Sequence, residues 1–124
     1  MTTPSDKPQF LLLLRHPFDG KGTRPDPEQM QQIMTRFMQW MKDISAKNTV
    51  LSTNGLEDQC KILRGPGGHA VSDGPYLEAK EIIGGYLLIT ADNYEQALDI
   101  ARACPGLDNQ MAVEVRPIRP KAGC

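Results

Sequence analysis

This chain of 124 residues lacks a charge excess of either sign, since 14 Lys and Arg side chains are matched by 15 Asp and Glu side chains. Nucleic-acid binders and polybasic membrane anchors normally carry a basic surplus, so we expect neither kind of partner. Long hydrophobic runs are also missing, because the longest apolar stretch, residues 10–14, is far too short to span a bilayer. With 40% hydrophobic residues, the chain has enough apolar material for one packed core. We therefore expect a small soluble globular protein.

Cysteine is sparse, and its three positions, Cys60, Cys104 and Cys124, match no zinc or redox spacing. No secretory leader is visible in residues 1–10, so we expect a cytoplasmic protein with free thiols. Cys60 and Cys104 lie among apolar residues and are expected to pack as small core hydrophobes rather than act as nucleophiles. No metal or nucleotide cofactor is expected, because neither a ligand cluster nor a phosphate-binding loop is present.

A long amphipathic helix is predicted over residues 27–47. Asp26 is the expected N-cap, Pro27 suits the first helical position, and Asn48 is a candidate left-handed C-cap. The apolar residues recur at spacings of three and four and form one stripe, which we expect to face the core, with Trp40 at its flank. This stripe consists of Met30, Ile33, Met34, Phe37, Met38, Met41 and Ile44.

The remaining elements follow from apolar runs and turn signals. Glycine- and proline-rich segments predict a turn at residues 65–68 and a break at residues 73–75. A second helix is predicted to begin after Asp92 or Asn93 and to end at Cys104. Strands are predicted at residues 10–14, 49–52, 60–64, 69–72, 86–89 and 111–118.

This order is two β-α-β halves with an inserted hairpin, which predicts an α+β protein of the ferredoxin-like class with an antiparallel sheet. We expect a flexible arm at residues 1–8, one domain at 9–119 and a tail at 120–124. Two helices can cover only one sheet face, yet the first strand and the strand at 86–89 are apolar on both faces. A second copy of the same sheet is the simplest cover, so we predict a homodimer through the open face.

Several segments together resemble the YCII-related domain proteins that carry a DGPF motif, in the YciI-like branch. The likeness is most specific in the stretch VSDGPY at residues 71–76, where Tyr76 stands in place of the usual Phe, and it covers nearly the whole chain. The other segments that carry it are residues 10–15, 38–41, 78–81, 84–86, 103–105 and 113–118.

This resemblance implies a ferredoxin-like α+β barrel that is usually dimeric. It implies little about chemistry, because most members have no assigned activity, although genes for DGPF members often neighbour sigma-factor genes. The YciI branch is associated with a His–Asp pair. The long helix of this chain has Trp40 in the comparable region and no matching histidine.

Asp73 is the first candidate for chemistry, as a base or ligand acceptor at the rim of a cleft. The alternative is an Asx-type turn, in which Asp73 bonds only its own backbone before Gly74 and Pro75. Lys80 could pair with Asp73 or bind an anionic substrate, and otherwise belongs to a solvated edge with weak ion pairs.

Arg15 and His16 end the first predicted strand. Arg15 could bind a carboxylate with two hydrogen bonds. His16 could carry a proton, but the sequence places no carboxylate partner beside it, and a lone histidine is more often polar surface. Tyr76, in the motif, is the third residue expected to line a ligand site, together with Arg15 and Lys80.

Two functions remain open. The first is a protein that binds or converts a small polar or aromatic molecule in a cleft between the sheet and the helices, near the DGPY loop. The second is a non-catalytic accessory or regulatory module linked to sigma-factor-dependent transcription. A pocket with converging charges would favour the first, and a filled interior with an exposed apolar patch would favour the second.

Overall fold

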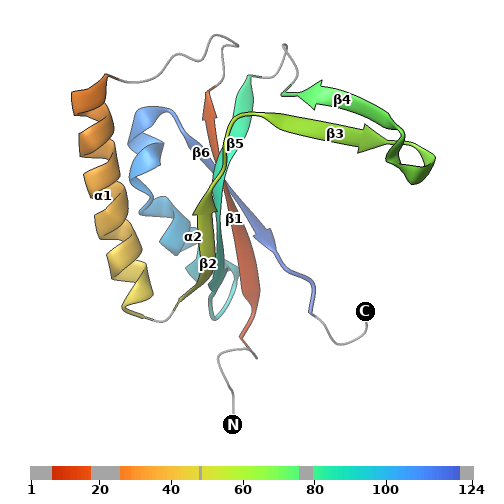
Figure 1. The fold of residues 1–124 in the computed structure, drawn as a ribbon. Coiled ribbons are helices and arrows are strands. Elements are labelled where there is room, and N and C mark those ends of the chain that lie inside the picture. The colour runs from red at the N-terminus through yellow and green to blue at the C-terminus, as the bar shows by residue number, and fades with distance from the viewer. Residues whose placement is uncertain (1–6, 18–25, 48, 76–79, 121–124) are drawn as a thin grey trace.

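The computed structural model is an antiparallel sheet with two helices on one side and a hairpin that reaches out on the other (Figure 1). The structure describes residues 7–17, 26–47, 49–75 and 80–120. The strands are β1 (Gln9–Pro17), β2 (Val50–Gly55), β3 (Cys60–Arg64), β4 (Ala70–Gly74), β5 (Glu81–Thr90) and β6 (Ala112–Pro117). The α-helices are α1 (Pro27–Ser45) and α2 (Tyr94–Arg102), and two short 3-10 helices span Pro66–Gly68 and Pro105–Asn109.

The start of α1 is the one predicted from the sequence. The Asp26 side chain accepts a hydrogen bond from the backbone N–H of Gln29 at 2.8 Å, and Pro27 occupies the first turn. The helix ends slightly earlier than predicted, with Ala46 in right-handed conformation as its C-cap. The expected cap, Asn48, lies outside the described residues.

Of the two N-caps that the sequence allows for α2, the structure uses Asn93. Its side chain accepts a hydrogen bond from the backbone N–H of Gln96 at 2.8 Å. The helix ends at Arg102, and a 3-10 turn takes up the Pro-Gly segment that follows. Within the described part of the chain, neither helix is long and apolar enough to cross a membrane.

The main sheet has the strand order β2-β5-β1-β6, and every neighbouring pair is antiparallel. Two β-α-β units interleave in this order, which is consistent with the predicted ferredoxin-like fold. Strands β3 and β4 pair with each other in a separate two-stranded sheet. The inserted hairpin is therefore confirmed, and it stands apart from the main sheet (Figure 1).

The core lies between the sheet and the two helices. Leu12, Leu87 and Ile89 are fully buried there. Trp40 of α1 packs against them with 4% of its surface exposed, and its indole N–H donates to the carbonyl of Ile100 at 3.3 Å. Other buried members of this cluster are Phe10, Leu14, Ile44, Ala91, Ala97, Ala101 and Cys104.

In the part of the chain that the structure describes, no helix lies on the opposite face of the sheet, here called the open face (Figure 1). The strand register places Leu88 directly beside Leu11, and both side chains, like that of Leu13, are half-buried. The prediction that β1 and β5 are apolar on both faces is therefore confirmed. Hydrophobic and polar side chains share this face, and their arrangement defines the candidate site described below.

Two predictions about apolar residues were wrong. Met34 and Met38 are 51% and 64% exposed rather than core. Met34 follows Ile33, and Met38 follows Phe37. Successive side chains point about 100° apart around a helix axis, which places the two methionines on the flank of the helix. Cys60 is exposed at the start of β3.

Two strand boundaries also differ from the prediction. The expected break at residues 73–75 begins later, because Asp73 and Gly74 belong to β4 and pair with β3. Strand β5 begins at Glu81 and runs through Gly84 and Gly85, which the sequence analysis placed before it. These residues lie in strands because pairing with the neighbouring strand supplies backbone hydrogen bonds, and these outweigh the local preference for a turn.

Candidate functional site

The space between the sheet and the helices holds a cluster of buried hydrophobic side chains. The titratable member of this cluster is Cys104, and burial raises the pKa of its thiol, which favours the protonated form. The charged and polar groups that could bind a ligand therefore lie outside this cluster.

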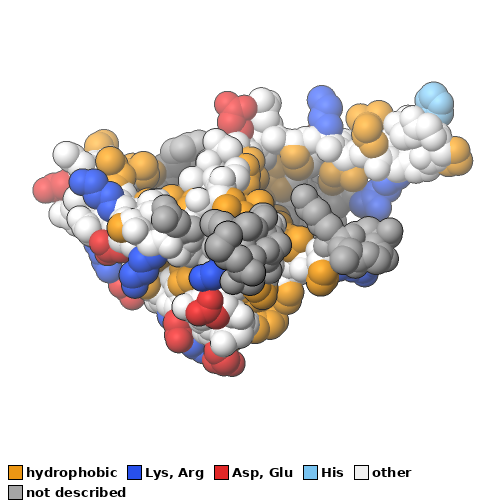
Figure 2. All heavy atoms as spheres, turned by 90° about the horizontal axis from the view of Figure 1, so that it is seen from below, with side chains coloured by type: hydrophobic (Ala, Val, Ile, Leu, Met, Phe, Trp, Pro, Cys, Tyr) orange, Lys and Arg blue, Asp and Glu red, His pale blue; other side chains and the backbone are white. Residues whose placement is uncertain are grey.

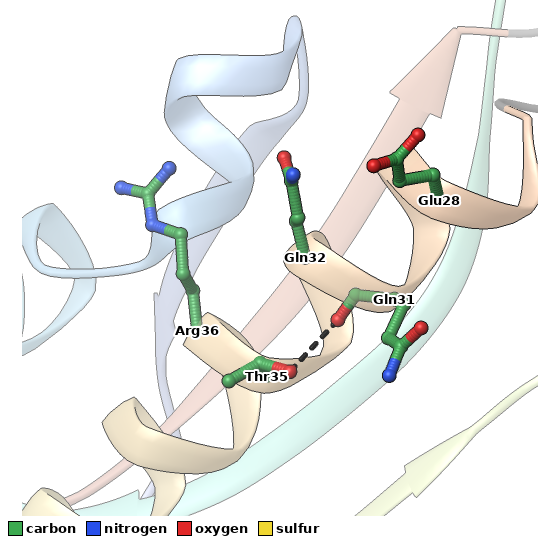
Figure 3. A pocket seen from close by; sticks show the side chains of 5 residues that line it. All are labelled: Glu28, Gln31, Gln32, Thr35 and Arg36. Atoms are coloured by element: carbon green, nitrogen blue, oxygen red, sulfur yellow. Dashed lines mark hydrogen bonds between the residues drawn. The ribbon is translucent and has the colours of Figure 1, made fainter.

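One candidate surface is a hollow of about 530 Å³ along α1 (Figure 3). The side chains that line it all come from this helix and are all exposed, and in the close-up Gln31 points away from Glu28 and Gln32. Such a hollow is a groove between neighbouring side chains of one helix rather than a built site. The lining residues are Glu28, Gln31, Gln32, Thr35 and Arg36.

The open face of the sheet holds a charged cluster. Arg15 of β1 donates from Nε and Nη2 to the same carboxylate oxygen of Glu114 on β6, at 2.9 Å and 2.6 Å. Arg116 lies 3.4 Å from the second oxygen of that carboxylate. The hydrogen bond from Arg15 lowers the pKa of Glu114, with its charge and that of Arg116 acting in the same direction. The cluster thus combines two cations with one anion.

A hydroxyl cluster occupies the other side of the open face. The phenol oxygen of Tyr86 on β5 lies 3.0 Å from the hydroxyl of Ser52 and accepts a hydrogen bond from Asn54 Nδ2, also at 3.0 Å. The hydrogen bonds from Ser52 and Asn54 lower the pKa of Tyr86, because they stabilise the phenolate.

The strand register aligns these two clusters in one row across four strands. Asn54 pairs with Tyr86, Tyr86 with Leu13, and Leu13 with Glu114. Adjacent strands lie about 4.8 Å apart, so the backbones of Tyr86 and Glu114 are separated by roughly 10 Å. Leu13 lies between the Tyr86 hydroxyl at one end of the row and the charged cluster of Arg15, Glu114 and Arg116 at the other.

His16 belongs to a different place, the end of β1 beside the base of the hairpin. Its Nε2 lies 3.8 Å from a carboxylate oxygen of Asp58, in the segment that joins β2 to β3. The imidazole covers Gly84, where an added Cβ would lie 2.6 Å from the ring. The structure thus identifies Asp58 as the carboxylate partner of His16, which the sequence could not place. Both side chains are partly exposed, and the two residues are far apart in the sequence.

Asp73, the first candidate from the sequence, belongs to β4 and not to the main sheet. It lies on the projecting hairpin, opposite Lys61, whose Nζ is 2.5 Å from the carboxylate, and its side chain is 81% exposed. Its charge partner is thus Lys61, rather than Lys80 as predicted. Lys80 is exposed just before β5, and Tyr76 lies outside the described residues.

Several residues of the open face were missed by the sequence analysis. A signal existed for Glu114 and Arg116, which alternate with Val113 and Val115 in β6 and so must face away from the helices. No local signal connects Tyr86 with Ser52, because the two belong to strands that only the sheet topology brings together. In the described residues, no three or more His, Cys, Asp or Glu side chains gather in a way that could hold a metal ion.

Comparisons with known proteins give one finding. A family model described as the YCII-related domain matches residues 5–121. No curated protein matches the chain. The match spans every described strand and helix, including the hairpin and all residues of the open face.

Proposed function

The chain belongs to the YCII-related domain family, and from this premise we propose that it is a homodimer that binds a small molecule between two open sheet faces. The arrangement of Arg15, Glu114 and Tyr86 on a leucine-rich surface carries this proposal. Small-molecule sites are mostly apolar, with a few polar groups that orient the ligand. The open face has this composition, and a second copy would turn it into an enclosed α+β barrel.

The charges of the site favour a ligand with an acidic group. Arg15 and Arg116 outnumber Glu114, so the charged cluster carries one net positive charge. The Tyr86 hydroxyl can donate to an oxygen at the other end of the ligand, and Leu13 supports an apolar or aromatic body between the two ends. This is the small polar or aromatic class that the sequence analysis expects, with the site moved from the helix side of the sheet to its open side.

A thermal-shift screen against metabolite and phenolic libraries tests the ligand. A compound that binds only the native state must raise the melting temperature. We expect the shift to disappear in Arg15→Gln. The shift should persist in the matched control Arg102→Gln. This variant removes the ion pair between Arg102 and Asp99 on α2, which lies away from the open face. A hit that shifts both variants like the wild type would place the site elsewhere.

Light scattering tests the dimer. At micromolar concentration we expect a mass twice the 13.7 kDa of one chain. Leu13→Lys places a charge at the centre of the open face and should yield a folded monomer. Met38→Lys, on the exposed flank of α1, should leave the dimer intact. A folded wild-type monomer would contradict both the dimer and the enclosed site.

The second candidate function is the non-catalytic accessory or regulatory module linked to sigma-factor-dependent transcription. The filled space between sheet and helices favours it, as does the exposure of Leu63 and Val71 on the hairpin, at 63% and 57%. Under this alternative the dimer forms, but the thermal-shift screen stays flat. Arg15→Gln then behaves like Arg102→Gln in every assay.

A further inference from the structure

The hydroxyl cluster of the open face has a donor hydrogen that its own members do not use. The hydroxyl oxygens of Ser52 and Tyr86 are 3.0 Å apart, and only one hydroxyl can donate to the other. Each hydroxyl carries one donor hydrogen. One hydrogen of the pair therefore has no acceptor in the part of the chain that the structure describes.

The hydrogen bonds of the cluster indicate that this free hydrogen belongs to Tyr86. Asn54 Nδ2 donates to the phenol oxygen and occupies one of its two acceptor sites. Ser52 occupies the other site when it donates, and this direction agrees with the lowered pKa of Tyr86, because both bonds stabilise the phenolate. Tyr86 then has no free acceptor site and offers only its own hydrogen. Its next partner must be an acceptor atom.

Two rows of side chains cross the open face with the same order of chemistry. Each row begins with a polar side chain on β2, continues through β5 and β1 with at least one leucine, and ends at a charged side chain on β6. The rows are Asn54-Tyr86-Leu13-Glu114 and Ser52-Leu88-Leu11-Arg116. They are two residues apart along each strand, which is about 7 Å and suits the width of one aromatic ring. A ligand that lies across the strands meets donors at one end and charges at the other.

The middle of the two rows is apolar and accessible. Leu11, Leu13 and Leu88 are half-buried in the single chain. Figure 2, which views the molecule from below, shows hydrophobic side chains at the surface along the hairpin and on the body beside it. The hairpin extends on the same side of the sheet as the open face (Figure 1). An apolar or aromatic body placed on these leucines removes apolar surface from water.

We propose that the ligand is an oxo acid with an aromatic or apolar body, whose carboxylate lies at Arg15 and Arg116 and whose carbonyl oxygen accepts the hydrogen of Tyr86. This inference rests on the proposed function and names the ligand class of the same site. A carbonyl oxygen is an acceptor without a donor hydrogen, which is what a phenol with both acceptor sites occupied can bind.

Ser52 and Asn54 are specificity-determining residues under this proposal. They occupy the acceptor sites of the phenol oxygen, so a ligand that ends in a pure donor such as an ammonium group finds no acceptor on Tyr86. A second carboxylate in place of the carbonyl leaves one negative charge in excess, because the charged cluster carries one net positive charge.

Two benzoates of the same shape test the assignment. 4-Acetylbenzoate carries a carbonyl oxygen opposite its carboxylate, and 4-isopropylbenzoate has no polar atom there. The measured quantity is the ratio of their dissociation constants, isopropyl over acetyl, from calorimetric titration. This ratio should fall by about threefold or more when Tyr86→Phe is combined with Ser52→Ala, because that variant loses the hydroxyl donors. Differences in hydrophobicity between the probes are the same in both proteins and cancel.

The matched control is Tyr94→Phe, which removes a phenol on α2 that donates to the carbonyl of Val115. Its ratio should equal that of the wild type. A second readout uses the wild-type protein labelled with carbon-13 at the tyrosine Cζ. The Tyr86 resonance, identified by its loss in Tyr86→Phe, should move on addition of 4-acetylbenzoate and move less with 4-isopropylbenzoate.

The outcomes separate this inference from the proposed function. A ratio that is unchanged in the double variant, while both probes still lose affinity in Arg15→Gln, overturns the oxo acid and leaves the proposed function standing. Absence of binding by both probes at millimolar concentration also overturns the oxo acid, and the library screen then decides the proposed function separately. Probes that bind with an affinity indifferent to Arg15→Gln and to the double variant overturn the placement of both ends of the ligand.

Discussion

Arg15 donates two hydrogen bonds to a single carboxylate oxygen of Glu114, although the two residues are 99 positions apart in the chain. The contact joins the central strand β1 to the edge strand β6 on the open face. Each side chain is about one-third exposed, so the pair is accessible to a ligand and still held in place. Two hydrogen bonds from one guanidinium fix the relative orientation of the two side chains.

Glu114→Gln should alter how stability depends on acidity. Arg15 lowers the pKa of Glu114 below its ordinary value of 4.5 in the folded state. A lowered carboxyl pKa contributes stability above the unfolded-state pKa, and that contribution is lost as the pH falls through the folded-state value. Urea unfolding from about pH 7 to pH 2 should show the wild type above the variant near neutrality, with the two curves converging in acid. A constant offset at every pH would contradict the ion pair.

Tyr86→Phe should remove a phenol whose pKa is lowered in the folded protein. The hydrogen bonds from Ser52 and Asn54 lower the pKa of Tyr86 below its ordinary value of 10.0. The difference between ultraviolet titrations of the wild type and of Tyr86→Phe should show one phenol transition below pH 10.0. Ser52→Ala should move that transition to higher pH. A difference transition at pH 10.0 or above would contradict the two hydrogen bonds.

Trp40→Ala should be severely destabilising. The side chain is buried beside Phe37 in an edge-to-face contact, and its N–H is bonded to the carbonyl of Ile100. Truncating a buried aromatic residue costs about 3–5 kcal/mol. Met38→Ala, on the exposed flank of the same helix, should change the free energy of unfolding by no more than about 0.5 kcal/mol. Because Trp40 is the single tryptophan, unfolding is followed by circular dichroism.

Gly84→Ala should displace His16 without unfolding the protein. An added Cβ would lie 2.6 Å from the imidazole ring, and a ring can move away by side-chain rotation at a cost of about 1 kcal/mol. The rotation carries Nε2 away from Asp58, so the variant should lose that contact. Nuclear magnetic resonance contacts between the ring and residue 84 report the displacement. A ring that keeps its wild-type contacts would show that the strand, not His16, had moved.

The sequence by itself determined the local elements of this protein. Asp26 and Asn93 begin their helices because each side chain bonds an N–H three residues ahead, within one turn of chain. The apolar runs of β1 and β5 likewise determined that these two strands carry hydrophobic side chains on both faces of the sheet. These features depend on neighbours in sequence, so a pattern of residues is enough to predict them.

Only the tertiary structure decided which side chains meet. The register of β2 on β5, which shifts between Val50 and Ser52, aligns Asn54 with Tyr86. The register of β1 on β6 places Arg15 near Glu114. A shift of one residue would turn every one of these side chains to the other face of the sheet. Bulges leave no reliable local signal, because they are fixed by pairing between distant strands. For this reason the sequence could name Arg15 as a candidate but could not name the carboxylate that it binds.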